Sequence, residues 1–272
     1  MKPILVLGAS GKTGRRIVDR LLARQIPVRL GSRAAAPSFD WHDPSTWQPA
    51  LDGVSAVYIS YYPDIAITGA PEAIEAFTRQ ALASGVRRLV LLSGRGELEA
   101  QRAEQVLQRS GADWTILSCS WFMQNFSEGV FLDSLLGGTL SLPVDNISEP
   151  FVDTDDIADV AVAALTESGH VGKVYELTGP RLMTFAQAVE AIAVAAGRAI
   201  RFETVSMDAF ARSLEEHRQP AEIVGFLQYL FGEVLDGRNE YLTDGVQRAL
   251  GRAPRDFTDY AKRTAAARTW GG

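Results

Sequence analysis

The chain has 272 residues, a formal net charge of −6 at pH 7 and 46% hydrophobic residues, values that are ordinary for a globular enzyme. The acidic balance argues against a nucleic-acid partner, because proteins that bind the phosphate backbone usually carry a basic face. Cys119 is the only cysteine and the three histidines are scattered, so the sequence predicts neither a disulfide nor a metal site. No apolar run approaches the roughly 20 residues that span a bilayer, and a strand begins too early to leave room for a signal peptide. We therefore expect a cytoplasmic protein without a membrane partner.

The first part of the chain alternates short apolar runs with amphipathic segments, which is the pattern of repeated β-α units. The predicted strands are residues 3–7, 28–31, 56–60, 89–93 and 114–117, and the predicted helices are residues 13–23, 71–84 and 97–109. Each connection is long enough for a right-handed crossover. The fold class that follows is α/β, a Rossmann-type doubly wound parallel sheet with a smaller C-terminal α+β lobe.

Beyond Trp121 this alternation stops. Residues 134–143, which contain two consecutive glycines, predict an excursion away from the sheet. Later elements are a helix that Asp155 and Asp156 cap, a strand at 173–177, a helix from the cap Thr184 to Ala196, a strand at 200–205 and an apolar helix at 221–234.

These elements predict two domains. Residues 1–177 would form the NADP-binding domain, with the excursion at about residues 131–150 reaching toward the substrate lobe, and residues 178–272 the smaller substrate or interaction lobe. The helix that begins at Pro220 is as consistent with a homodimer face as with a lid.

The glycine motif between the first strand and the first helix carries the strongest functional signal. Gly8, Gly11 and Gly14 allow a sharp turn and let backbone N–H groups approach a pyrophosphate at the helix N-terminus. The alternative is a tight turn without a ligand. An ATP-binding P-loop is excluded, because its first glycine would have to stand at Val6.

The end of the second strand indicates which dinucleotide binds. NAD-binding proteins usually place an acid there for the ribose 2′-hydroxyl, whereas this strand ends in Gly31, Ser32 and Arg33. Arg33 can make forked hydrogen bonds to a 2′-phosphate, and Ser32 and Lys12 can add to them. NADP(H) is therefore the expected cofactor, against the alternative that Arg33 is a solvated loop residue.

The ligand of a doubly wound sheet lies across the carboxyl ends of its strands. Residues that the sequence assigns to the cofactor are Gly8, Ser10, Gly11, Lys12, Thr13, Gly14, Ser32, Arg33, Ser60, Tyr61, Ser93 and Cys119. Those assigned to a pocket for an aromatic or conjugated substrate are Tyr62, Trp121, Phe122, Met123, Asn125 and Phe126. Core packing is the alternative for Trp121, Phe122 and Phe126, and a packed thiol is the expected role of Cys119.

Several strings extend this interpretation to a family. They are 8–14 (GASGKTG), 114–117 (WTIL), 121–126 (WFMQNF), 150–158 (PFVDTDDIA) and 177–180 (LTGP) followed by Thr184. Together they resemble the NmrA-like atypical short-chain dehydrogenase/reductase family over nearly the whole chain. Within that family, 11–13 (GKT), 39–41 (FDW) and 252–257 (RAPRDF) are similar to the branch with azoreductase-like and quinone-reductase-like proteins and the agroclavine and festuclavine dehydrogenases.

Two departures from the family bear on catalysis. No tyrosine has a lysine four residues later, so the acid/base pair Tyr-x-x-x-Lys is absent, and Ala100 stands where related proteins often carry a lysine. Ser118 and Cys119 replace the Arg-Pro that commonly follows the leucine of this strand. The candidates for a proton donor are Tyr61, Tyr62, Ser93 and Ser120.

Two functions remain open at this point. The first is a reductase whose acceptor already carries an electron sink, such as a quinone, an iminium ion, an enone or an azo compound. The second is a non-catalytic NADP(H) sensor of the NmrA type. Fold alone does not separate them.

Overall fold

The computed structural model describes residues 1–271, and the contacts within the chain divide them into two compact units. The first unit comprises Met1–Cys119, Thr154–Leu177 and Asp244–Ala253, and the second comprises Ser120–Asp153, Thr178–Thr243 and the segment from Pro254 onward. A segment boundary falls at residue 177, where the sequence places its division. The chain nevertheless enters the second unit first at Ser120, and it returns to the first unit twice, at Thr154 and at Asp244.

A six-stranded parallel sheet forms the centre of the first unit, in the order β2-β1-β3-β4-β5-β8. Its strands are β1 (Ile4–Leu7), β2 (Val28–Gly31), β3 (Ala56–Ile59), β4 (Arg88–Gly94), β5 (Asp113–Cys119) and β8 (Lys173–Leu177). The order reverses between β1 and β3, because the chain goes from β1 to β2 on one side and later to β3 on the other. A sheet of this kind binds its ligand at such a reversal.

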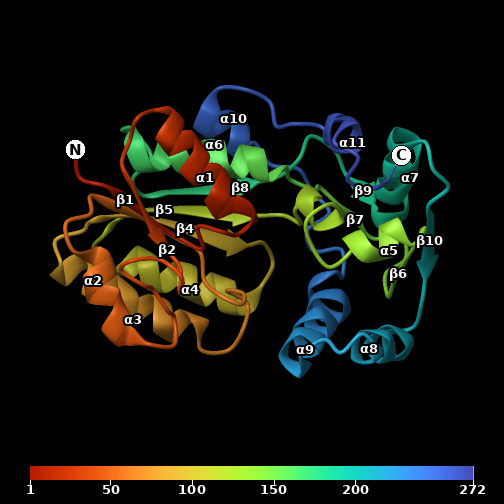
Figure 1. Ribbon diagram of the computed structural model, residues 1–272, viewed down its shortest axis with the longest axis horizontal. Coiled ribbons are helices and arrows are strands. Elements are labelled where there is room, and N and C mark those ends of the chain that lie inside the picture. The colour runs from red at the N-terminus through yellow and green to blue at the C-terminus, as the bar shows by residue number, and fades with distance from the viewer. Residues whose placement is uncertain (272) are drawn as a thin grey trace. The chain divides into compact units, whose positions relative to one another are not determined.

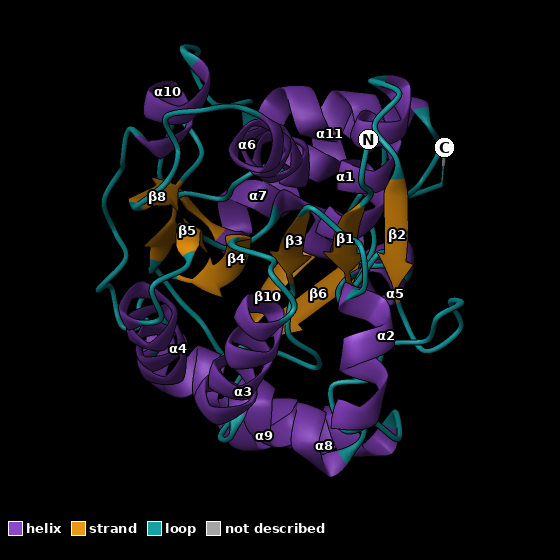
Figure 2. Cartoon of the chain, turned by 90° about the vertical axis from the view of Figure 1, so that its left-hand side faces the viewer, coloured by secondary structure: helices purple, strands orange, loops and turns teal. Residues whose placement is uncertain are grey.

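Helices cover both faces of this sheet (Figures 1 and 2). The helices α1 (Lys12–Ala23), α6 (Thr154–Thr166) and α10 (Gly245–Leu250) lie on one face, and α2 (Trp47–Leu51), α3 (Ala70–Ala83) and α4 (Leu98–Arg109) lie on the other. The strands β1 and β3 are buried along their whole length, which explains why both are continuous apolar runs.

The second unit has its own apolar core. Its elements are α5 (Leu132–Leu136), β6 (Thr139–Leu142), β7 (Ser148–Glu149), β9 (Met183–Thr184), α7 (Phe185–Ala196), β10 (Arg201–Thr204), α8 (Met207–Glu216), α9 (Ala221–Tyr229) and α11 (Phe257–Ala266). The strands β6 and β10 pair in parallel, and β7 and β9 pair antiparallel. Interlocking aromatic rings fill the core, with Phe185 in contact with both Phe126 and Phe151.

The predicted fold class is confirmed, and every strand predicted in the first half is present. Three details differ from the sequence analysis. The aspartates 155 and 156 lie in the first turn of α6 and do not precede it, because the helix already begins at Thr154. The segment predicted as one helix at 221–234 is α-helical as far as Tyr229, and a wider π-helical turn, Leu230–Val234, follows it. The excursion at 134–143 contains the end of α5 and the whole of β6, and β6 pairs with β10.

Residues 1–271 lack two features that would indicate other classes of function. No helix in this range is both long and apolar enough to cross a membrane. The same residues contain no group of three or more His, Cys, Asp or Glu side chains arranged to hold a metal ion.

Candidate functional site

The glycine loop after β1 folds as the motif requires. Gly8 has a φ of +66°, which a residue with a side chain rarely adopts, and its carbonyl accepts a hydrogen bond of 2.8 Å from the N–H of Gly11. A Cβ atom at Gly14 would lie 2.1 Å from the oxygen of Gly8, so the start of α1 packs directly on the loop. The turn therefore depends on glycine at its first and last positions.

The first turn of α1 fits an anionic ligand. Gly11 precedes the helix in an extended conformation and provides no side-chain cap, and the turn contains no acidic residue. The N–H groups at a helix start have no partner within the helix, and the helix dipole favours negative charge there. Thr13 is buried and its Oγ1 accepts a hydrogen bond of 3.0 Å from the hydroxyl of Tyr58. The group of Thr13 that could bind a ligand is therefore its backbone N–H. This turn would hold the pyrophosphate of a dinucleotide.

The end of β2 places a cation beside the loop that follows β3. Arg33 is exposed, and its guanidinium carbon lies 5.7 Å from the centre of the Tyr62 ring, which is 60% exposed. Ser32 is half-buried, and its carbonyl accepts a hydrogen bond of 2.9 Å from the N–H of Phe39. The segment 31–33 has no acidic side chain, so its charge suits a phosphate better than a ribose hydroxyl.

Ser60 and Tyr61 follow β3 and lie against an aromatic cluster. A Cβ atom at Gly8 would lie 3.2 Å from the Cβ of Ser60, so the two loops are in close contact. The indole N–H of Trp41 donates to the carbonyl of Ser60 at 3.1 Å, and the rings of Trp41 and Tyr61 lie 4.9 Å apart. Burial, with a smaller effect of the negative charge of Glu72, raises the pKa of Tyr61. Tyr61 is therefore a weaker acid than an ordinary tyrosine.

The ends of β4 and β5 form a buried polar cluster. Ser93 is 3% exposed, and its register partner on β5 is Ser118. Burial raises the pKa of Glu104 on α4, an effect that the hydroxyls of Ser93 and Ser118 oppose and the charge of Glu176 increases. The oxygens Ser93 Oγ and Glu104 Oε1 are both buried without a well-aligned hydrogen-bond partner. This cluster also includes Arg95.

Arg95 and Cys119 complete the cluster at this edge of the sheet. The Arg95 side chain is 3% exposed, and its Nε lies 3.3 Å from a carboxylate oxygen of Glu176. Cys119 is 5% exposed, and burial raises the pKa of its thiol. The negative charge of the nearby Glu104 raises this pKa further, by a smaller amount. A thiol in such surroundings is not a nucleophile.

The segment after β5 belongs to the second unit, where several of its predicted site residues are core residues. Met123 and Phe126 are fully buried, and Ser120 is 3% exposed. Trp121 is half-buried and packs against the rings of Phe131, Phe185 and Phe231. Core packing, the alternative that the sequence left open for Phe126, describes that residue, and Met123 is a core residue as well. The half-buried residues Trp121, Phe122 and Asn125 retain surface for a ligand.

Three residues near these strand ends are absent from the sequence-based site. They are Asp64 in the loop after β3, Arg95 after β4 and Glu104 on α4. Arg95 directly follows the last residue of β4, and such a position at a strand end could have indicated it. Nothing in the local sequence distinguishes Asp64 or Glu104 from an ordinary surface acid, because their burial comes from other elements.

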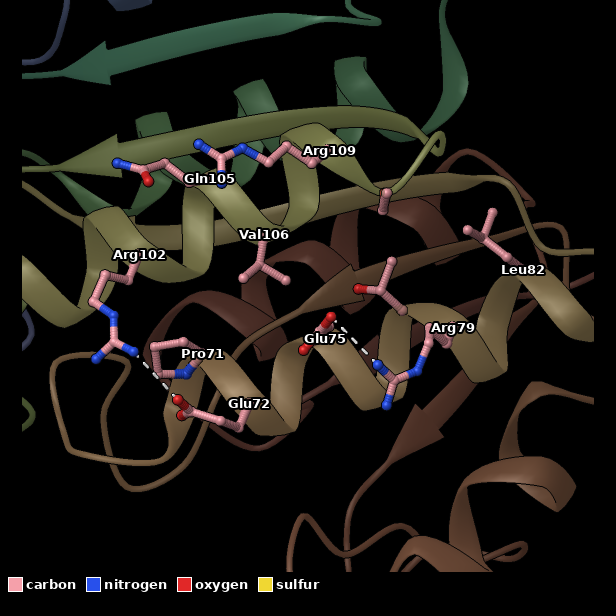
Figure 3. Close-up of a pocket in the computed structure, with 11 residues that line it drawn as sticks. Pro71, Glu72, Glu75, Arg79, Leu82, Arg102, Gln105, Val106 and Arg109 are labelled. Carbon is pink, nitrogen blue, oxygen red and sulfur yellow. Dashed lines mark hydrogen bonds and ion pairs between the residues drawn. The ribbon is translucent and has the colours of Figure 1, made fainter.

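A surface pocket of about 430 Å³ lies between α3 and α4, and Figure 3 shows its lining side chains. The pocket contains none of the predicted site residues. Its charges are largely paired with one another, since Arg79 lies 3.3 Å from Glu75 and Arg102 lies 3.3 Å from Glu72. This pocket is therefore a polar groove, and the predicted site residues lie outside it.

Comparisons with known proteins agree with the geometry of the first unit. Residues 8–168 match the profile of a protein family described as NAD(P)H-binding. An uncharacterized oxidoreductase of Bacillus subtilis, YesF, is 31% identical and covers 97% of this chain and 96% of its own length. The agroclavine dehydrogenase of Claviceps fusiformis is 30% identical over 94% of this chain and 95% of its own length. These matches confirm the family resemblance found in the sequence.

Solved structures show the same fold. The NADPH-dependent quinone oxidoreductase QOR2 of Escherichia coli, in complex with NADPH, superposes with a TM-score of 0.79. It is 20% identical and covers 96% of this chain and 99% of its own.

Proposed function

The chain belongs to the NAD(P)H-binding family of oxidoreductases, and we propose that it is an NADPH-dependent reductase that transfers hydride to an activated electrophile. The substrate class is a small aromatic or conjugated molecule, such as a quinone, an iminium ion, an enone or an azo compound. The proposed location is the cytoplasm, and a homodimer remains a prediction from the sequence.

One observation supports the preference for NADPH over NADH. Arg33 is exposed after β2, the strand that pairs with β1, and residues 31–33 contain no acid. We propose that the backbone of the glycine loop binds the pyrophosphate and that Arg33, Ser32 and Lys12 bind the 2′-phosphate.

The candidate proton donors support an acceptor that needs little acid catalysis. NADPH supplies the hydride when it is bound. The pKa of Tyr61 is raised by burial, and Ser93 is buried beside Glu104, so neither offers an acid matched to neutral pH. A quinone that accepts hydride delocalises the electron pair onto its oxygens and takes one proton from water. An iminium ion that accepts hydride becomes a neutral amine and needs no proton in that step. These substrates are therefore preferred over a simple ketone.

A redox sensor is the second candidate function. The observation that favours it is the same lack of a well-placed acid, since a sensor needs only the cofactor site. A sensor would bind NADPH and NADP⁺ with different affinities and would consume no NADPH with any acceptor.

The test combines a substrate panel with a pair of arginine variants. NADPH consumption is measured against quinones, cyclic imines and azo dyes, and turnover with at least one class is expected. In Arg33→Ala the preference for NADPH over NADH should fall about 10- to 100-fold, the effect of losing charge-assisted hydrogen bonds to a phosphate. Arg24→Ala is the matched control, because Arg24 is exposed at the opposite end of α1 and pairs with Glu167. If Arg33→Ala keeps the wild-type preference, the cofactor assignment is wrong, and if no acceptor consumes NADPH, the sensor is the better function.

A further inference from the structure

Tyr62 lies beside one of the cations of the proposed cofactor site. It is 60% exposed in the loop after β3, and the guanidinium carbon of Arg33, which follows β2, lies over its ring at 5.7 Å from the centre. A guanidinium in this position is attracted by the negative face of the aromatic ring. Because both loops follow the carboxyl ends of strands that pair with β1, the contact lies where a doubly wound sheet binds its ligand.

The two loops are tied to each other at their bases. The indole N–H of Trp41 donates to the carbonyl of Ser60 at 3.1 Å, and the ring of Trp41 lies 4.9 Å from that of Tyr61. On the other loop, the carbonyl of Ser32 accepts a hydrogen bond of 2.9 Å from the N–H of Phe39, which closes the segment between them. The backbones on either side of the contact are therefore held together, and the long arginine side chain is the part that can still move.

The guanidinium of Arg33 keeps its hydrogen-bond donors available for a ligand. Within residues 1–271 it forms neither an ion pair nor a hydrogen bond. A contact over a ring face engages no acceptor atom, so the five N–H groups can still donate to a phosphate. A long side chain that binds an anion loses rotamer entropy, and a contact that already orients the side chain reduces this loss. The ring of Tyr62 is placed to provide that contact.

We propose that Tyr62 is a positioning residue of the cofactor site, whose ring holds the guanidinium of Arg33 ready for the 2′-phosphate of NADPH. The inference rests on the proposed function, since it assumes that Arg33 binds that phosphate. Tyr62 acts through its ring and not through its hydroxyl, so this role differs from the substrate contact and the proton donor that the sequence predicts for it. The consequence is that Tyr62 strengthens the binding of NADPH and hardly affects NADH, which has no 2′-phosphate.

Tyr62→Leu and Tyr62→Phe form the decisive pair of variants. Leucine keeps the apolar bulk and removes the aromatic face, whereas phenylalanine keeps the face and removes the hydroxyl. In Tyr62→Leu the ratio of NADPH to NADH affinity should fall about two- to five-fold, because losing a cation–π contact at an exposed site lowers the fraction of guanidinium in the binding orientation by that factor. Tyr62→Phe should keep the ratio within about 1.5-fold of the wild type, since both rings attract a cation.

Two further comparisons separate this role from a merely structural one. In an Arg33→Ala background, Tyr62→Leu should not change the ratio any further, because the group that the ring orients is gone. Tyr241→Leu is the matched control for the loss of an exposed tyrosine ring, since Tyr241 is 49% exposed and belongs to the second unit, and its ratio should equal that of the wild type. The midpoint of Tyr62→Leu in urea denaturation should stay close to the wild-type value, because substitutions of exposed side chains change stability little.

The measurement is titration calorimetry of NADPH and NADH, repeated with adenosine 2′,5′-bisphosphate and 5′-AMP, which lack the nicotinamide. Tyr62→Leu should weaken the binding of NADPH and of the bisphosphate by the same factor and leave NADH and 5′-AMP nearly unchanged. An equal loss for NADH, an equal loss of the ratio in Tyr62→Phe, or an equal loss in the Arg33→Ala background would overturn the role of Tyr62 alone, as would an unchanged ratio in Tyr62→Leu. Failure of the wild type to bind either dinucleotide would instead overturn the proposed function, and this inference with it.

Discussion

Alanine at two glycines of the loop should separate folding from cofactor binding. In Gly14→Ala the new Cβ atom would lie 2.1 Å from the oxygen and 2.7 Å from the carbonyl carbon of Gly8. Both are backbone atoms in a tight turn, so the loop must move by more than 1 Å to restore an ordinary contact of about 3.4 Å or more. We expect a loss of about 3 kcal/mol of unfolding free energy, the upper part of the range for overpacked sites, and a Tm lowered by about 6–12 °C.

Gly11→Ala is the matched variant with the opposite outcome. Gly11 has a φ of −75° and a ψ of 175°, which alanine adopts readily, and its Cβ would lie 3.2 Å from the oxygen of Gly8. Its stability should stay within about 1 kcal/mol of the wild type. The methyl group would nevertheless stand where the pyrophosphate approaches the backbone, so NADPH affinity should fall about ten-fold or more.

The assay is urea denaturation of each protein without cofactor, together with NADPH titration followed by fluorescence. The reasoning fails if Gly14→Ala is as stable as Gly11→Ala, because the loop at Gly8 would then accommodate the new Cβ atom at little cost in unfolding free energy. It also fails if Gly11→Ala binds NADPH as tightly as the wild type, because the ligand would then not use this turn.

Three other predictions concern groups outside the glycine loop. Urea denaturation should show that Glu104→Gln is as stable as the wild type at pH 4 and more stable at pH 7.5. The reason is that burial raises the folded pKa of Glu104, so its carboxyl destabilises the fold once it ionises. Equal stability of the two proteins at both pH values would contradict this. Thr184→Ala should lose about 1 kcal/mol of unfolding free energy and lower the Tm by about 2–4 °C, because the Thr184 hydroxyl and the Gln187 side chain form a capping box at the start of α7. Gln187→Ala should lose less unfolding free energy. A Thr184→Ala protein with the wild-type Tm would refute the cap. Cys119 should react with a thiol reagent at pH 8 far more slowly in the folded protein than in urea, and equal rates would show that the thiol is accessible.

The sheet of the first unit could be predicted because each of its strands is a local pattern. The segments 4–7 and 56–59 are continuous apolar runs, and parallel strands buried on both faces have this form. The capped helix α7 was predicted for the same reason, since its start at Thr184 and its end before Gly197 depend on neighbouring residues only. The sequence analysis did not predict α8, α10 or α11.

Helix α10 shows why the local sequence pattern was insufficient to predict some of the helices. It has six residues, too few for a clear periodicity, and its first residue is glycine. A Cβ atom at Gly245 would lie 2.0 Å from the carbonyl oxygen of Glu176, so this glycine is needed for contact with β8. Arg248 then lies over the ring of Tyr175 on the same strand. These contacts join residues about 70 positions apart, and a single sequence contains no sign of them.

The candidate site also contains some residues that the local sequence indicates and others that it does not. The glycine loop, Arg33 and the strand-end serines are recognisable because each follows a strand, and strand ends are where such a sheet binds its ligand. Asp64 and Glu104 differ from surface acids only through burial by other elements, so their raised pKa values depend on the tertiary structure.

An ion-pair network explains why the segment Asp244–Ala253 belongs to the first unit. Arg252 lies 2.7 Å from Asp156 and 2.6 Å from Asp159, and Asp159 is also 2.6 Å from Arg20 of α1. Asp156 is fully buried, and an unpaired carboxylate in such a place costs about 3–5 kcal/mol. Arg252 of this late segment therefore pairs with a buried charge of the first unit. A division of the chain by sequence order cannot place the segment, because its position is determined by a charge on α6 nearly one hundred residues earlier.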